Sequence, residues 1–111
     1  MRIATPVDAD GNTAGAWGRA HWVAVAEVHE GAITDWEVHQ VEWDRLHDTG
    51  TEGSHHARVA SFLRLNDIQA VVLDHCGPGM TRMLLTMGIP QLPASPGDAR
   101  QSVLTAVSNV G

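Results

Sequence analysis

Seven histidines and a single cysteine are the side chains of this sequence best suited to holding a metal. Imidazole and thiolate suit clusters of the iron–sulfur type better than magnesium or calcium. The sequence has no Cys-x-x-Cys and no His-Glu-x-x-His motif, so it predicts no closed tetrahedral zinc site. Ser54 precedes His55 without a nucleophile-elbow pattern around it, and a serine triad is therefore not predicted either.

Cys76 is the most specific of these candidates because of its neighbours. It follows His75 directly, in a glycine-rich turn that is expected to open a helix. The positive end of that helix would favour the thiolate, which is the form that binds metals. The backbone N–H groups around Gly77 and Gly79 are an alternative site for an anion. A third interpretation is a small buried cysteine at a tight turn.

The elements that must position these residues begin with three strands, expected over residues 2–7, 21–28 and 32–41. The short turn at 29–31 predicts that the second and third strands form an antiparallel hairpin. Residues 42–53 read as a polar loop. A continuous apolar run predicts a buried strand over 68–73, and a brief last strand is expected over 88–92.

Three helices complete the expected order. The first begins with Ser54 as its N-cap and ends at 66–67, with His56, Val59, Ala60 and Leu63 on one face. The second begins near Pro78, and its stripe of Met80, Met83, Leu84 and Met87 is expected to be core, although Met80, in the first turn, could instead face a ligand. The third opens with a capping box over 95–98 and turns Val103, Leu104, Val107 and Val110 inward.

This β-β-β-α-β-α-β-α order predicts one α/β domain over residues 1–111. Helical crossovers are right-handed, so the later strands should run parallel to the first. The expected fold is ribonuclease-H-like, a mixed five-stranded sheet in the order 3-2-1-4-5 with three helices on its faces. Ligands of such sheets bind at the carboxyl ends of the parallel strands. The residues expected at that end are Asp8, Asp10, Trp17, Arg19, His21, His39, His47, His55, His56, Asp74, His75 and Cys76.

Several histidines at this end also have a purely structural interpretation. His56 would be a partly buried residue at the helix start, and His55 a solvated residue of the first turn. His47 would be a surface residue of the polar loop, and His21 and His39 would be strand-end residues. His29, in the hairpin turn, lies away from the cluster.

The composition argues against nucleic acid and membrane as partners. The formal net charge is −6, and the seven basic residues are all arginines scattered along the chain, without the basic stripe that phosphate binding needs. No apolar run has membrane length, and the N-terminal residues lack the apolar stretch of a signal peptide. One cysteine allows no internal disulfide, so we expect a cytoplasmic protein.

Several segments together resemble the dinitrogenase iron–molybdenum cofactor biosynthesis family. They are residues 1–8, Trp17-Gly18-Arg19-Ala20-His21-Trp22, His56 with 59–63, the strand and turn over 70–79, and 84–89 with its closing Leu-x-x-x-Gly-Ile pattern. The resemblance covers nearly the whole chain and implies a ribonuclease-H-like fold that binds or carries iron–sulfur or iron–molybdenum clusters. The chain departs from the family at Trp17, where an aromatic residue preceded by His is common. It departs again at His75-Cys76, which stand in the usual glycine turn.

The first functional hypothesis is a carrier of a metal cluster, not an enzyme. Its expected ligands are Cys76, His75, His55 and His56, with Arg19 opposite the cluster's negative charge, and Cys76→Ala should abolish binding. A cluster donor or acceptor protein would be its partner.

Two other functional hypotheses stay open. One is a metal-dependent nuclease that uses Asp8, Asp10 and Asp74, although no further carboxylate is evident and an acidic chain repels nucleic acid. The other is a metal-free regulatory module that binds a small anion at the turn from Gly77 to Gly79. A homodimer through the edge strand near Val38 is compatible with each of these functions.

Overall fold

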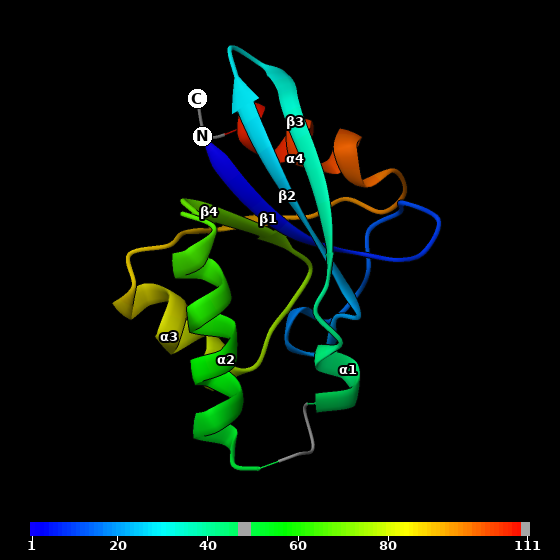
Figure 1. The fold of residues 1–111 in the computed structure, drawn as a ribbon. Coiled ribbons are helices and arrows are strands. Elements are labelled where there is room, and N and C mark those ends of the chain that lie inside the picture. The colour runs from blue at the N-terminus through cyan, green and yellow to red at the C-terminus, as the bar shows by residue number, and fades with distance from the viewer. Residues whose placement is uncertain (47–49, 110–111) are drawn as a thin grey trace.

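A mixed five-stranded sheet in the order β3-β2-β1-β4-β5 forms the centre of the molecule, as predicted (Figure 1). The computed structural model describes residues 1–46 and 50–109. The strands are β1 (Arg2–Val7), β2 (Trp22–His29), β3 (Ala32–Gln40), β4 (Ala70–Leu73) and β5 (Gln91–Pro93). The helices are η1 (Trp17–Arg19, a 3-10 turn), α1 (Trp43–Leu46), α2 (Glu52–Leu65), α3 (Pro78–Thr86) and α4 (Ala99–Ser108).

The strand pairings confirm the mixed topology expected from the sequence. β1 is antiparallel to β2 and parallel to β4, with Ile3 opposite Ala26 on one side and Ala70 on the other. β2 and β3 form the antiparallel hairpin, whose turn residues Glu30 and Gly31 both have positive φ, as in the tight turns that suit strand twist. β4 is parallel to β5 and is buried along its whole length.

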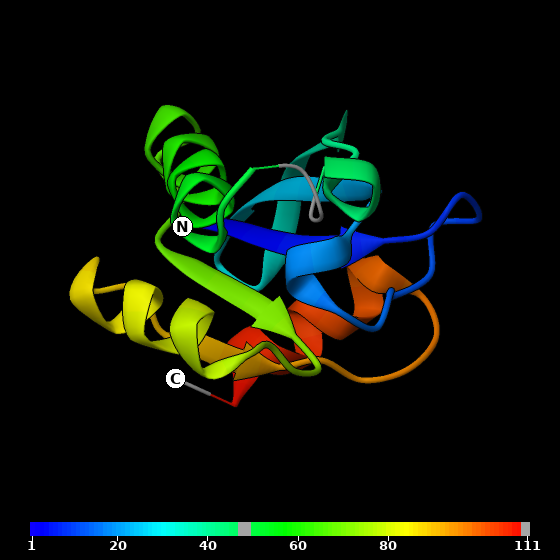
Figure 2. The same ribbon diagram turned by 90° about the horizontal axis from the view of Figure 1, so that it is seen from below.

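Helices cover both faces of the sheet (Figure 2). On one face α2 and α3 pack Val59, Leu63 and Leu84 against alternate residues of β1, β2 and β4. On the other face α4 packs Val103 and Ala106 against the intervening residues of the same strands. Because side chains alternate across a strand, the buried central strands need apolar residues at every position. No helix in the described part of the chain is long and apolar enough to cross a membrane.

The structure corrects three predictions about the helices. Part of the predicted polar loop at 42–53 is the short helix α1, which begins at the buried Trp43. The N-cap of α2 is Thr51 and not Ser54, and the N-cap of α4 is Asp98, which accepts from the Gln101 N–H. Ser95 instead donates its N–H to the Ser102 hydroxyl. The predictions for His47 and Val110 fall outside the described residues.

Thr51 and Ser54 cap α2 reciprocally. The Thr51 hydroxyl accepts from the Ser54 N–H at 3.1 Å, and the Ser54 hydroxyl accepts from the Thr51 N–H at 3.0 Å. We expect Thr51→Ala to lower the free energy of unfolding by about 1 kcal/mol, because one first-turn N–H group loses its acceptor. Chemical denaturation measures this change, with Thr105→Ala near the end of α4 as the control. Equal stability of the two variants would contradict the capping role.

Candidate functional site

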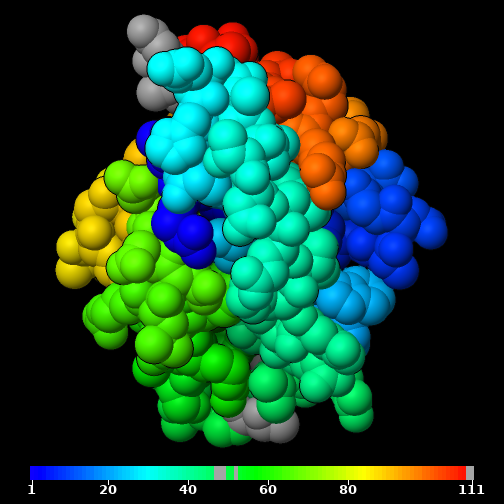
Figure 3. Space-filling model, turned by 45° about the horizontal axis from the view of Figure 1, so that its top comes forward, coloured from blue at the N-terminus to red at the C-terminus, as the bar shows by residue number. Residues whose placement is uncertain are grey.

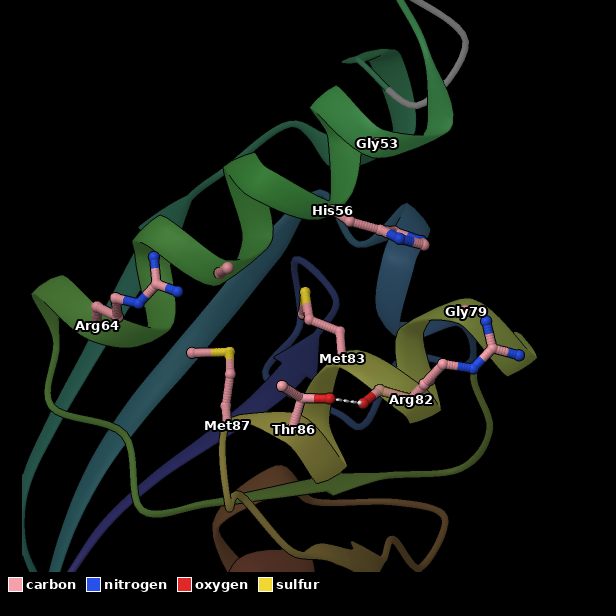
Figure 4. Close-up of a pocket in the computed structure, with 9 residues that line it drawn as sticks. Gly53, His56, Arg64, Gly79, Arg82, Met83, Thr86 and Met87 are labelled. Carbon is pink, nitrogen blue, oxygen red and sulfur yellow. Dashed lines mark hydrogen bonds between the residues drawn. The ribbon is translucent and has the colours of Figure 1, made fainter.

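η1, α2 and α3 meet at one end of the sheet and define the candidate site. The Gly18 carbonyl of η1 accepts a hydrogen bond from the His55 Nε2 of α2 at 2.8 Å. A Cβ atom at Gly18 would lie 3.5 Å from the Met80 methyl of α3, so η1 lies against α3 as well as α2. The N-termini of α2 and α3 lie side by side at this end (Figure 4). This is the carboxyl end of β4, where the topology predicted a site.

His55 is buried, with 3% of its surface exposed. The interpretation of His55 as a solvated residue of the first turn is therefore wrong. Its Nε2 faces the Gly18 carbonyl and its Nδ1 lies 2.8 Å from the Arg58 guanidinium. A guanidinium can only donate, so Nδ1 is the acceptor and Nε2 carries the proton. Both ring nitrogens are therefore engaged with protein groups in this structure, and His55 holds η1 against α2.

His56 and Gly79 line a groove of about 510 Å³ between α2 and α3 (Figure 4). We call it the α2–α3 groove, and it is lined by Gly53, His56, Ala60, Arg64, Gly79, Arg82, Met83, Thr86 and Met87. His56 and Gly79 lie at the end where both helices begin, whereas Arg64 and Met87 lie at the other end. Of the predicted site residues, the groove thus brings together His56 and Gly79.

The α2–α3 groove is cationic although the chain as a whole is acidic. Arg64 and Arg82 are exposed, and neither makes an ion pair within the described part of the chain. No acidic side chain of the described residues lines the groove. An arginine without a counter-charge beside a hollow favours an anionic ligand, because its fork of N–H donors has no other charged partner.

Two methionines give the α2–α3 groove a sulfur-containing surface. Met83 and Met87 are one turn apart on α3 and half-buried, and both line the groove. From the sequence the stripe was expected to be core, and Met80 was the one methionine that could face a ligand. The structure reverses these places, because Met80 is buried in the core whereas Met83 and Met87, which also pack against the core, line the groove. The thioether is polarizable and adapts its shape, which suits a soft, irregular ligand.

Cys76 and His75 lie on the turn that precedes α3, outside the lining of the groove. The Cys76 thiol is partly buried, 3.2 Å from the Thr81 hydroxyl and 3.7 Å from the Gln91 side-chain oxygen, to which it donates. His75 is exposed and stands 3.6 Å from the Asp74 carboxylate. The Cys76 thiol is therefore held by polar neighbours, next to the exposed imidazole of His75.

The four predicted metal ligands are not gathered into one cluster. Among residues 1–46 and 50–109, no group of at least three histidine, cysteine, aspartate or glutamate side chains is arranged to hold a metal ion. His21 pairs with Asp44 at 3.0 Å, and His39 packs edge-on against Phe62, so both have local partners at strand ends. Arg19 is exposed on η1 and makes no ion pair in the described part of the chain.

Asp8 and Asp74, two carboxylates of the nuclease hypothesis, lie in different surroundings. Asp8 caps its own loop, since one of its oxygens accepts from the N–H groups of Asp10 at 2.9 Å and Asn12 at 3.0 Å. Asp74 faces the solvent beside His75. Within the described residues neither aspartate belongs to a group of three or more histidine, cysteine, aspartate or glutamate side chains that could hold a metal ion, as a two-metal site would require.

Taken together, the α2–α3 groove is suited to hold an anion with a soft surface. Arginine supplies charge and directional donors, His56 supplies an imidazole, and the first-turn N–H groups of Gly79 and Met80 have no acceptor within α3. Four lining residues were not predicted as site residues from the sequence: Arg64, Arg82, Met83 and Met87. The available signal was the placement of Arg82 and Met83 in the first turns of a helix that opens at the predicted site.

Solved structures with the same fold come from several organisms. The apo form of the orange protein from Desulfovibrio gigas aligns with a TM-score of 0.73 at 18% sequence identity, over 97% of this chain and 88% of that one. A candidate dinitrogenase from Methanocaldococcus jannaschii aligns with a TM-score of 0.70 at 10% identity, over 98% and 89%. A candidate NifB protein from Thermotoga aligns with a TM-score of 0.70 at 18% identity, over 97% and 87%. At these identities the likeness establishes the fold.

The model of the dinitrogenase iron–molybdenum cofactor family matches residues 1–110. No curated protein matches the sequence significantly.

Proposed function

The chain belongs to the dinitrogenase iron–molybdenum cofactor family, as the resemblance predicted, and from this premise we propose that it carries an anionic metal–sulfur cluster in the α2–α3 groove. The family supports a role connected with such clusters, and the groove is the part of this chain best suited to hold one. We further propose that the protein acts as a carrier and not as an enzyme.

The observation that carries this proposal is that Arg64 and Arg82, which make no ion pair with any described residue, lie beside a hollow lined by methionine. Metal–sulfur clusters present sulfur atoms and a net negative charge, so they need cations and tolerate polarizable neighbours. A volume of about 510 Å³ is in the range of small-ligand sites and accommodates an object of several heavy atoms. Because the arginines are exposed, added salt should weaken the binding.

The proposed mode of binding is mainly electrostatic. The Cys76 thiol is turned toward Thr81 and Gln91, and His55 uses both ring nitrogens within the fold. His56 is the only one of the four predicted ligands that lines the groove. In this proposal His56 contacts the cluster directly, whereas His55 only positions the groove. His75 and Cys76 lie outside the lining of the groove, on the turn that precedes α3.

Anaerobic purification without a histidine tag tests the proposal. We would measure iron, molybdenum and sulfide together with the visible absorption spectrum. Near-stoichiometric metal with a charge-transfer band supports a carrier. A colourless protein that also fails to take up a reconstituted cluster would rule the carrier function out and would favour the metal-free alternative, in which the same cationic groove binds a small oxyanion.

Cys76→Ala distinguishes electrostatic binding from thiolate ligation. We expect this variant to retain its cluster, because the thiol lies outside the lining of the groove and contacts Thr81. Metal content and the visible spectrum of the two proteins, prepared side by side, measure the effect. Loss of cluster in Cys76→Ala with an unchanged unfolding transition would restore the cysteine as a ligand.

A further inference from the structure

A second pocket lies on the opposite face of the sheet, where α4 leaves the ends of β2 and β3 uncovered. It has a volume of about 240 Å³ and is lined by Val7, Asp8, Ala9, Gly11, Trp22, Trp36 and Val38. Trp22 and Trp36 are half-buried, and Val38 is 50% exposed. We call it the tryptophan pocket. Aromatic side chains that stay partly exposed in a hollow are typical of interaction surfaces.

The chemistry of the tryptophan pocket favours a cation. One Asp8 oxygen accepts two backbone N–H groups, but Asp8 makes no ion pair within the described residues, and no basic residue lines the pocket. The Trp36 ring already holds one guanidinium, because Arg100 lies over it at 4.9 Å from the ring centre. Indole faces attract cations with an apolar stem, and a nearby carboxylate adds charge.

The open edge of β3 runs directly beside this pocket. β3 is the outermost strand of the sheet, and Figure 3 shows it uncovered along the surface. Its outer N–H and C=O groups can pair with one further strand. In such a strand, the residues opposite Trp36 and Val38 would point to the pocket's face, about 5 Å from those two side chains.

Charge along β3 narrows the kind of segment that fits. Asp35 and Glu37 are exposed on the face opposite the pocket, and neither pairs with an arginine in the described part of the chain. An added strand would thus meet Asp8 on the pocket's face, where Arg100 lies over Trp36, and Asp35 and Glu37 on the other face, so the acidic groups outnumber the one arginine. Opposite charges across neighbouring strands stabilise pairing, whereas like charges oppose it.

We propose that a basic, extended segment of a partner protein pairs with β3 and inserts an arginine or lysine side chain into the tryptophan pocket. Main-chain hydrogen bonds along the edge supply affinity, and the pocket selects the cationic side chain. A second copy of the chain fits this edge less well. Pairing centred on Trp36, for example, would set Asp35 opposite Glu37 of the copy.

The test is a titration of the whole chain with a short acetylated and amidated peptide in which arginine alternates with valine. We expect saturable binding that weakens with salt and moves the indole N–H signals of Trp22 and Trp36 in NMR spectra. Asp8→Asn should weaken binding about five-fold, while the asparagine oxygen can still accept both loop N–H groups. Trp36→Leu should weaken it by a similar factor.

Matched controls decide the interpretation. The same peptide with citrulline in place of arginine has the same shape without charge, and Asp67→Asn removes one charge at the far end of α2. We expect the citrulline peptide to bind the chain weakly. We expect Asp67→Asn to bind the arginine peptide as tightly as the unmodified chain does. Equal binding of the two peptides, or of Asp8→Asn and the unmodified chain, would overturn the proposal. So would absence of binding, or a stable dimer in sedimentation that Val38→Arg dissociates.

Discussion

Replacing both Arg64 and Arg82 with glutamine is expected to reduce the affinity for the cluster about ten-fold or more. Each arginine is exposed and lacks an ion pair within the described residues, so each has its full charge available to an anion in the groove. Two exposed charge contacts of about 1 kcal/mol each account for this loss. Metal content after purification, and the salt concentration that releases the cluster, measure the effect.

Arg100→Gln removes one positive charge and is the matched control for each single replacement, Arg64→Gln and Arg82→Gln, measured beside the double variant. Arg100 lies over Trp36 on the opposite face of the sheet, so its loss changes the net charge without touching the groove. We expect Arg100→Gln to retain its cluster and the unfolding midpoints of all variants to stay close to that of the unmodified protein. Equal loss of cluster in Arg100→Gln would show that net charge, and not the groove, governs binding.

Trp17→Ala is expected to lower the free energy of unfolding by about 3–5 kcal/mol, the largest single-residue effect on stability that we predict. Trp17 is fully buried, and its ring meets Trp43 edge-on at 5.2 Å. Trp43 in turn meets Phe62 of α2 at 5.5 Å. Removing Trp17 therefore leaves a cavity where η1, α1 and α2 meet. Small proteins have only about 5–15 kcal/mol of stability, so this loss is severe.

Trp17→Phe separates the loss of packing from the loss of a polar group. The Trp17 indole N–H is buried and has no acceptor in the described structure, so its removal costs no hydrogen bond. We expect Trp17→Phe to cost clearly less than Trp17→Ala in urea or thermal unfolding. A phenylalanine variant as unstable as the alanine variant would mean that the indole nitrogen has a partner that the packing does not reveal.

The sheet was predictable because its signals are local and mutually consistent. The two-residue turn at Glu30 and Gly31 determined the hairpin, and the apolar run ending at Leu73 indicated a strand covered on both faces. Right-handed crossovers then left one simple strand order. The caps were harder to predict, because Thr51 and Ser54 are both good N-cap residues and only their reciprocal hydrogen bonds assign the positions.

The candidate site was only partly predictable, since its geometry depends on how elements pack. His55 and His56 differ by about 100° around α2, which places one beneath η1 and the other in the groove. Arg64 and Arg82 are far apart in the sequence, and only the packing of α2 beside α3 brings them to one hollow. Trp43 begins a helix that the sequence pattern could not predict, because four residues are too few to show a helical period.

The two helices that begin at the site are built differently at their first turns, and this difference has a dynamic consequence. α2 starts with a reciprocal pair of side-chain caps, whereas α3 starts at Gly77 with no side-chain cap and with open space where a side chain would be. The amides of Gly79 and Met80 should therefore exchange with deuterium readily in the ligand-free protein. A cargo anion seated against them would slow that exchange. The start of α3 would thus report occupancy of the groove, even for a colourless ligand.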